Sequence, residues 1–405
     1  MTAGSVNADP AASAFEQAGT AAEFTAVAKQ ALAAQRSALT ESLAKGAAIE
    51  TLIGRYRECL DAIVYKAWDL GMRRDAGLVL VATGGYGRGE LYPHSDIDLL
   101  VCGQEAEHVR HAEAIGQFFS LLWDSGLKVG QAVRSVGQCL EQSRLDVATY
   151  TSLLEIRKLA GDEKVFLSLE AAVNSPEVYD ARGYFEAKRH EQRQRHAKFH
   201  NTADNLEPNL KEGPGGLRDF HTLNWLSRKL YGVSSLAGLV PLGLLGDAEW
   251  QALLRNWRIV ARLRFALHLV VKRPEERLLF DHQKNLAELF GLQDTPDNLA
   301  VEQLMQEFFR SAAILLRIND RLLQRFEEHL AVEQVVTPID DQFVLKNGYL
   351  LALDNRFDAH ALPRLFELFA VWGDQPVCKG LHSDTARGLA ESLPDILSYA
   401  EQPEP

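Results

Sequence analysis

The spacing of apolar residues predicts helices near the start of the chain. Between residues 21 and 71 apolar positions recur every three or four residues, as at Tyr56 and Leu60, which is the spacing of one face of an α-helix. The residues before them, 1–20, are mostly alanine and small polar residues, and we expect a loose tail there. The tail and the first part of the helical pattern form a predicted N-terminal segment, 1–54.

Short apolar runs then predict a sheet. Leu78–Ala82 is an uninterrupted apolar run that ends in glycines, which is typical of a buried strand, and 96–101 is its expected partner. A helix is expected over 112–123 and a third strand over 127–133. Because strands alternate with helices here, we expect a compact α/β domain over 55–160.

The rest of the chain is predicted to be mainly helical. Over 161–335 long amphipathic stretches recur at helical spacing, and we expect an all-helical domain that flanks the α/β domain. The last segment, 336–405, begins with a predicted β-hairpin over 343–351 and continues with two helical patterns. Its end, 402–405, is expected to be disordered. Together these predictions give an α+β fold class.

Composition and charge narrow the classes of function. The chain has 405 residues, 46% of them hydrophobic, so two or more domains with substantial cores are expected. Its net charge of −12 argues against nucleic-acid binding, which needs a basic surface. The four scattered cysteines form no zinc or disulfide pattern. No apolar run is long enough to span a membrane, and no signal peptide is evident. We therefore expect a cytoplasmic protein with no membrane or nucleic-acid partner.

The most informative local pattern is a glycine-rich run, 84–89, followed closely by two aspartates. Asp96 and Asp98 flank Ile97 inside an apolar run. In a strand this places both carboxylates on one face while Ile97 turns into the core. Two parallel carboxylates repel each other unless a cation lies between them, and hard oxygen ligands of this kind favour Mg²⁺. Asp96 and Asp98 are therefore the predicted metal ligands and catalytic residues.

Glycine, arginine and serine near the aspartates suit a triphosphate. Gly84 and Gly85 bare the backbone, so that N–H groups can approach phosphate oxygens at the start of an expected helix. Arg88 is expected either to contact the triphosphate or to pair with Glu90, and Ser95 either to bind a phosphate or to cap the turn. In nucleotidyl transfer, two metal ions stabilise the attacking and leaving oxygens. A dinucleotide-binding fold is excluded because its Gly-x-Gly-x-x-Gly spacing is absent.

The run 84–100, Gly-Gly-Tyr-Gly-Arg-Gly-Glu-Leu-Tyr-Pro-His-Ser-Asp-Ile-Asp-Leu-Leu, resembles the nucleotidyltransferase signature of the DNA polymerase β superfamily. More narrowly, it is similar to that of the bacterial PII uridylyltransferase/uridylyl-removing enzymes. Residues 205–219 resemble a second hallmark of that family, and 262–269 and 277–283 resemble a third. The resemblance extends in the same order over about residues 50–400.

The resemblance implies a reaction and its partners. Enzymes of this family use UTP and Mg²⁺ to attach UMP to a tyrosine hydroxyl of the PII signal protein, with diphosphate released. They also carry an HD phosphohydrolase domain that removes UMP and two ACT domains that sense glutamine. We expect both functions to be absent from this chain, as in a truncated or natural short form. An adenylyltransferase of the glutamine synthetase type and a non-catalytic nucleotide-binding regulatory module are the alternatives.

Three further features complete the predicted site. Lys211 and Arg218 flank a run of glycines, so they are expected to reach the triphosphate, although such a run also serves as a plain connector. Superfamily members often carry a third carboxylate on a later strand, but 129–134 has none. Glu155 is the nearest candidate, with an exposed helix carboxylate as the alternative. The basic stretch 188–200 is expected to be a solvated face, or else to dock the partner or the phosphates.

Overall fold

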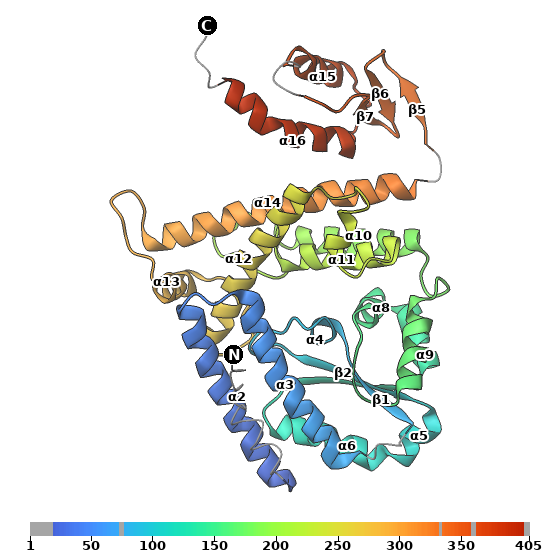
Figure 1. Ribbon diagram of the computed structural model, residues 1–405, viewed down its shortest axis with the longest axis vertical. Helices are drawn as coiled ribbons and strands as arrows, with labels where there is room; N and C mark the ends of the chain where they lie inside the picture. The colour runs from blue at the N-terminus through green and yellow to red at the C-terminus, as the bar shows by residue number, and fades with distance from the viewer. Residues whose placement is uncertain (1–18, 73–76, 332–333, 358–361, 401–405) are drawn as a thin grey trace, which may run out of the picture. The chain divides into compact units, whose positions relative to one another are not determined.

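The computed structural model describes residues 19–72, 77–331, 334–357 and 362–400 (Figure 1). Nearly all of the predicted N-terminal tail and the whole of the predicted disordered end lie outside these residues. The chain divides into two compact units. The first unit comprises Met1–Gly238 and Asp247–Leu316, and the second comprises Leu239–Gly246 and Arg317–Pro405.

The N-terminal helical pattern forms two long helices, α2 (Ala21–Ala44) and α3 (Ile49–Gly71). Helix α2 begins at a capping box. The Thr20 hydroxyl accepts a hydrogen bond from the backbone N–H of Glu23, and the Glu23 carboxylate accepts one from the N–H of Thr20. Helix α3 runs across the predicted boundary between residues 54 and 55, so the N-terminal helices continue into the α/β domain without a linker.

The apolar runs form a four-stranded mixed sheet in the order β3-β2-β1-β4. Its strands are β1 (Leu78–Ala82), β2 (Ile97–Gly103), β3 (Val129–Arg134) and β4 (Arg157–Gly161). Strand β1 pairs antiparallel with β2 and β4, whereas β2 pairs parallel with β3. All residues of β1 are buried, so both faces of the sheet are covered at its centre.

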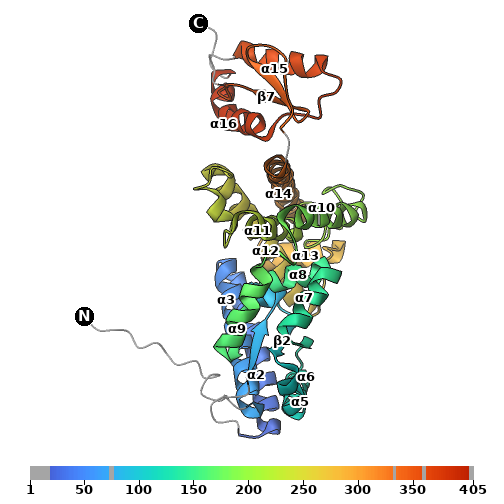
Figure 2. The same ribbon diagram turned by 90° about the vertical axis from the view of Figure 1, so that its right-hand side faces the viewer.

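Helices between and after the strands cover this sheet. They are α4 (Gly84–Gly87), α5 (Glu105–Arg110), α6 (Ala112–Asp124), α7 (Val136–Leu145), α8 (Val147–Leu154) and α9 (Glu163–Asn174). Figures 1 and 2 show α3, α6 and α9 around the strands, and all three contact the sheet. Trp68 of α3 meets Phe118 of α6 edge-on, with ring centroids 5.3 Å apart. Their aromatic contact joins α3 to the helix layer.

Beyond the sheet domain the chain is almost entirely helical. The helices are α10 (Ala181–Ala197), α11 (Leu217–Tyr231), the 3₁₀ helix η1 (Leu236–Leu239), α12 (Asp247–Val271), α13 (Phe280–Leu289) and α14 (Ala300–Leu330). Helix α10 lies beside α11 and also contacts α8 of the sheet domain (Figures 1 and 2). The sheet domain and α10–α12 therefore belong to one compact unit.

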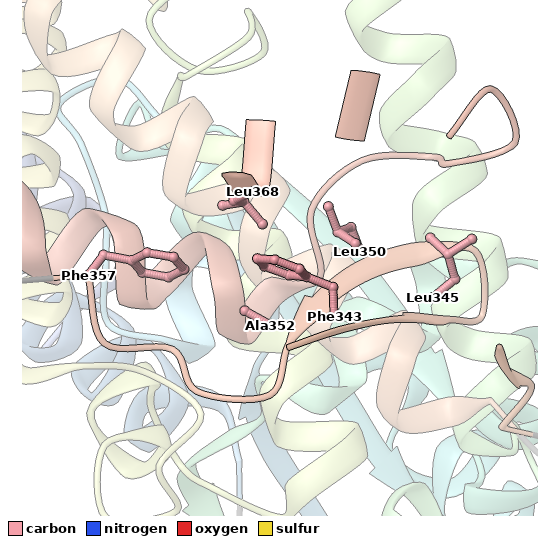
Figure 3. Close-up of a cluster of buried hydrophobic side chains, with 6 residues drawn as sticks. All are labelled: Phe343, Leu345, Leu350, Ala352, Phe357 and Leu368. Carbon is pink, nitrogen blue, oxygen red and sulfur yellow. The ribbon is translucent and has the colours of Figure 1, made fainter. Parts of the chain in front are cut away.

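The second unit contains a small sheet and two helices. They are β5 (Val336–Pro338), β6 (Phe343–Lys346), β7 (Tyr349–Ala352), α15 (Leu362–Asp374) and α16 (Ser383–Ala400). The predicted hairpin turn is confirmed, because Asn347 and Gly348 both have the positive φ angles of its tight turn, 52° and 85°. Phe343 and Leu350 from the hairpin, Phe357 and Leu368 pack in a buried cluster (Figure 3).

The α+β fold class is confirmed by this arrangement of a mixed sheet with a helical region. The strand predicted at Leu78–Ala82 has the predicted bounds, and the other predicted strands and helices differ by a few residues at their ends. No helix in the described residues is both long and apolar enough to cross a membrane.

Candidate functional site

A cavity of about 360 Å³ lies in the first unit, where the β1–β2 connection and α8 of the sheet domain meet α10, α11 and α12. Its walls include every residue predicted for the site: Gly84, Gly85, Arg88, Ser95, Asp96, Asp98, Glu155, Lys211 and Arg218. These residues span more than a hundred positions of sequence, and the fold brings them to one place. The sheet domain supplies the glycines and the aspartates, and the helical region supplies Lys211 and Arg218.

The two aspartates flank the start of β2. Ile97 between them is only 1% exposed, whereas Asp96 and Asp98 are both exposed, as alternation along a strand requires. In the described part of the chain, neither carboxylate takes part in a side-chain hydrogen bond or an ion pair. Burial and the charge of Asp96 raise the pKa of Asp98, against an opposing effect of Lys211. The pair therefore carries negative charge that no side chain neutralises.

This donor set fits a divalent cation. Mg²⁺ in proteins is usually bound through one or two carboxylates, with the remaining positions filled by water and substrate phosphates. No three His, Cys, Asp or Glu side chains among the described residues come together as a metal site. Asp96 and Asp98 would therefore hold the ion together with oxygens of the nucleotide. Ser95 precedes the pair, and its backbone N–H donates to the carbonyl oxygen of Tyr92 (2.9 Å).

The glycine-rich run makes the sharp turn between β1 and β2. Gly84 has a φ of +55°, and a Cβ atom there would lie 3.5 Å from the Oδ2 atom of Asp98. At Gly87 a Cβ atom would overlap the carbonyl oxygen of Glu155. The helix expected after the glycines is a single turn, α4, so the macrodipole of a long helix is not available to a phosphate. The backbone N–H groups of Gly84 and Gly85 are still available to phosphate oxygens, because the first N–H groups of a helical turn have no partner within it.

Arg88 and Glu155 form a buried ion pair beside this turn. The Arg88 guanidinium donates to the Glu155 carboxylate and, at 3.1 Å, to that of Glu90. Burial alone would lower the pKa of Arg88, but the two carboxylates outweigh burial and raise the pKa. The pairing of Arg88 with Glu90 is present, and because Arg88 also lines the cavity, its expected contact with a triphosphate stays a prediction.

Glu155 does not have the surroundings expected of a third metal ligand. It follows the last residue of α8 and is only 8% exposed, so it is also not the exposed helix carboxylate of the alternative interpretation. Its carboxylate is engaged by Arg88, and it joins no group of three metal-ligating side chains in the described residues. The geometry gives Glu155 the role of holding Arg88.

Strand β3 explains why no acidic residue follows the pair on the next strand. Gly130 is the partner of Asp98 in the β2–β3 register, and a Cβ atom at Gly130 would overlap the Oδ1 atom of Asp98. Any side chain at this position would displace the carboxylate. Gln131 is next, is exposed, and is paired in register with Leu99.

The two predicted cations lie around the start of α11: Lys211 is in the loop before the helix, and Arg218 is in its first turn. Asn209 holds its turn by accepting the backbone N–H groups of Lys211 (3.1 Å) and Glu212 (2.7 Å). Arg218 donates to Glu212 (3.0 Å). Asp219 is fully buried and accepts hydrogen bonds from the N–H of Gly215 and from three side chains of α10, those of Gln192, Arg195 and His196. The loop is therefore fixed on α10 rather than being a loose connector.

The cations of the cavity repel one another. Burial lowers the pKa of Lys211, and the charges of Arg264 and Arg218 lower it further. Lys211 approaches its nearest carboxylate, Glu212, only to 3.9 Å. A polyphosphate placed among these groups would relieve the repulsion. Among the described residues the two aspartates lack a cation, and the basic groups pair with nearby carboxylates yet still repel one another. This charge pattern suits a metal–nucleotide complex.

Sequence reasoning missed several residues of the cavity wall. The basic stretch was expected to be a solvated face, but Lys188 is only 2% exposed. Its Nζ atom lies 2.7 Å from Glu191 and 4.4 Å from the centre of the Trp225 ring. Lys188, Gln192 and Arg195 are all buried on one face of α10, but all three are polar, so no apolar periodicity marks that face in the sequence.

Two further charge pairs line the same cavity. Arg264 of α12 donates to Glu276 (2.6 Å), and hydrogen bonds from Arg264 and His268 lower the pKa of Glu276 to about 2 against the effect of burial. His221 of α11 approaches Glu90 at 3.0 Å, and burial together with Arg88 lowers the pKa of His221 to about 4. Arg264 and His221 lie on helices whose inward face cannot be identified without their tertiary partners, and Glu90 and Glu276 lie outside the helices.

The comparisons with known proteins agree with this geometry. Residues 71–168 match the nucleotidyltransferase domain, and residues 183–323 match the family described as GlnD PII-uridylyltransferase. Nucleotidyltransferase domains generally use a divalent metal ion, as the two unpaired aspartates would require. The two matched regions supply the two halves of the cavity wall.

Similar full-length proteins are named bifunctional uridylyltransferase/uridylyl-removing enzymes. That of Xanthomonas campestris pv. campestris (strain 8004) is 46% identical over 378 residues, which are 93% of this chain and 43% of the relative. That of Xanthomonas axonopodis pv. citri (strain 306) is 45% identical over the same shares. That of Pseudomonas aeruginosa (strain LESB58) is 40% identical over 90% of this chain and 41% of the relative. The chain thus spans less than half the length of these relatives, and it belongs to the PII-uridylyltransferase family.

Proposed function

We propose that this chain transfers UMP from UTP to a tyrosine hydroxyl of a PII signal protein, with Mg²⁺ as the metal and diphosphate as the leaving group. The observation that carries the proposal is the pair of carboxylates without a cation partner, Asp96 and Asp98, in one cavity with partly buried and mutually repelling cations. The names of the relatives support uridylyl transfer in particular. Because UTP is a cytoplasmic substrate, the proposed location is the cytoplasm.

The chain's own residues divide the work between binding and charge stabilisation. Asp96 and Asp98 would hold Mg²⁺, which would neutralise the α-phosphate and the leaving diphosphate. Lys211 and Arg218 would bind the diphosphate as charge accumulates on it, and the bare backbone of Gly84 and Gly85 would approach its oxygens. A tyrosine hydroxyl has a pKa near 10 and attacks slowly at neutral pH unless its proton is drawn away. The unpaired carboxylates are the groups placed to attract it.

The test is transfer of labelled nucleotide to purified PII protein. With Mg²⁺ present, UTP should label PII and ATP should not. Asp96→Asn and Asp98→Asn should each lower the rate by about 10²-fold or more. Asp124→Asn, an exposed aspartate at the end of α6, is the matched control and should behave as the unchanged chain.

Two results would overturn the proposal. Preferential labelling by ATP would favour an adenylyltransferase. Tight binding of nucleotide without transfer to any PII protein would make the chain a nucleotide-binding regulatory module.

A further inference from the structure

A second cavity, of about 250 Å³, lies on the β3 side of Asp98. Its walls come from the end of β1, from β2 and β3 and from α7 and α8, and they include Thr83, Gly130, Gln131, Arg134, Thr149 and Ser152. Asp98 and Ser152 line both this cavity and the one already described. The carboxylate of Asp98 therefore faces two separate spaces.

The two spaces differ in charge. Five basic side chains line the first cavity: Arg88, Lys188, Lys211, Arg218 and Arg264. Arg134 is the one basic residue in the described wall of the second. A diphosphate is stabilised among the cations of the first cavity, so the nucleotide's leaving group belongs there.

The chemistry of phosphoryl transfer then fixes the direction of attack. The attacking oxygen and the leaving oxygen lie roughly in line on opposite sides of the phosphorus. With the leaving diphosphate in the first cavity, the acceptor has to approach the α-phosphorus from the side opposite that diphosphate. The second cavity shares Asp98 with the first and lacks its cluster of cations, so it suits this approach.

Three features of β3 suit an incoming chain segment. Gly130 has no side chain, so nothing from β3 separates Asp98 from the second cavity. Strand β3 is an edge of the four-stranded sheet, so its outer backbone groups are not paired with another strand of that sheet. Gln131 is exposed, and in the described part of the chain no carboxylate pairs with Arg134. A polar segment with an acidic residue would satisfy both side chains.

We propose that the second cavity is the acceptor subsite: the hydroxyl-bearing loop of the acceptor protein lies along β3, Arg134 binds it on the face of Asp98, and Gln131 binds it from the opposite face of the strand. This inference rests on the proposed function and adds to it the side of entry and two specificity-determining residues. The bond that forms joins the acceptor oxygen to the α-phosphorus, the bond to the diphosphate breaks, and the acceptor's proton passes by way of the unpaired carboxylates to solvent.

The kinetic test compares each variant with a matched control. Arg134→Ala and Gln131→Ala should raise the KM for the PII protein by about tenfold, the loss expected for a charge-assisted hydrogen bond. The KM for UTP should stay within about twofold. Arg144→Ala and Gln142→Ala, exposed on the neighbouring helix α7, are the controls and should change neither constant. An altered KM for UTP with an unaltered KM for PII, or no change in either, would overturn the subsite.

A binding readout separates this inference from the proposed function. A photo-crosslinking residue at position 131, as Gln131→benzoylphenylalanine, should crosslink to PII protein when Mg²⁺ and a non-hydrolysable UTP analogue are present. The same residue at Gln142 should not. Crosslinking at 131 without UMP transfer would keep the subsite and reject the transferase. Transfer with no crosslinking at 131 would keep the transferase and reject the subsite.

Discussion

Gly130 of β3 lies directly across from Asp98 of β2, and the aspartate's carboxylate occupies the space that a side chain at Gly130 would need. Parallel pairing of the two strands sets this relationship, since it places the residues side by side on one face of the sheet. A side chain at position 130 is therefore incompatible with the position of the Asp98 carboxylate.

Gly130→Ala should consequently damage activity far more than stability. The added methyl group would push the Asp98 carboxylate away from the metal position, and we expect kcat to fall by about 10²-fold. The variant would be compared with Gly116→Ala, where a Cβ atom meets nothing within 4 Å on helix α6. Unchanged kcat in a folded Gly130→Ala chain would contradict the stated position of Asp98.

Glu155 and Asp98 should respond differently to Mg²⁺. Glu155→Gln removes the charge that holds Arg88, so we expect lower kcat and a lower midpoint of denaturation, with the Mg²⁺ concentration for half-maximal activity unchanged. Asp98→Asn should raise that concentration by about tenfold or more because it removes a ligand. Glu141→Gln, exposed on α7, is the control. An equal shift in Mg²⁺ dependence for Glu155→Gln would restore it as a metal ligand.

Lys211 and Arg218 should act on the nucleotide rather than on the acceptor. Lys211→Ala and Arg218→Ala remove charges from the first cavity, so the KM for UTP should rise by about tenfold or more and become less sensitive to salt. Lys198→Ala and Arg193→Ala, both exposed at the end of α10, provide controls of the same charge. The prediction is wrong if Lys211→Ala and Arg218→Ala raise the KM for PII protein and leave the KM for UTP unchanged.

His221 predicts how stability depends on pH. Burial and Arg88 lower its pKa from 6.5 to about 4, so at intermediate pH the unfolded chain binds a proton that the folded chain does not. Stability should fall as the pH decreases from about 6.5 to about 4, by about 1.4 kcal/mol per pH unit from this residue.

Glu90, which His221 approaches, has a pKa far below its usual range. The stability that Glu90 contributes is also lost in acid, as the pH falls through and below the pKa that this carboxyl has in the unfolded chain. Denaturant midpoints at a series of pH values would measure both effects. His221→Gln should flatten the curve between pH 6.5 and 4, whereas His190→Gln, exposed on α10, should leave it unchanged. A His221→Gln curve parallel to that of the unchanged chain would show that His221 titrates normally.

Local patterns predicted most elements because they depend on neighbours in sequence. The apolar run Leu78–Ala82, the helical spacing over Asp247–Val271 and the Asn-Gly turn before Tyr349 each carry their structure within a few residues. The glycines and the two aspartates of the site could be predicted for the same reason, since they lie within fifteen positions of one another. The single-turn length of α4 was not predicted; the backbone leaves the helical conformation at Gly89, whose φ is +77°.

The remaining site residues depend on distant contacts. Glu155 meets Arg88 across 67 positions, and Glu90 meets His221 across 131. Lys188 lies on a helix so rich in charge that its sequence suggests solvent on every side. Only the packing of α10 against α11 shows that one face of it is enclosed. Propensity and periodicity carry no information about such pairs, because their energies arise after the helices have met.

The sheet domain and the helical region both form the wall of the first cavity, which has a consequence for engineering. Asp96 and Asp98 stand on one portion of the polypeptide, and Lys211, Arg218 and Arg264 stand on another, more than a hundred residues downstream. The nucleotidyltransferase portion expressed alone would lack these three cations. Anyone exchanging catalytic modules between such proteins would have to move α10, α11 and α12 along with the sheet.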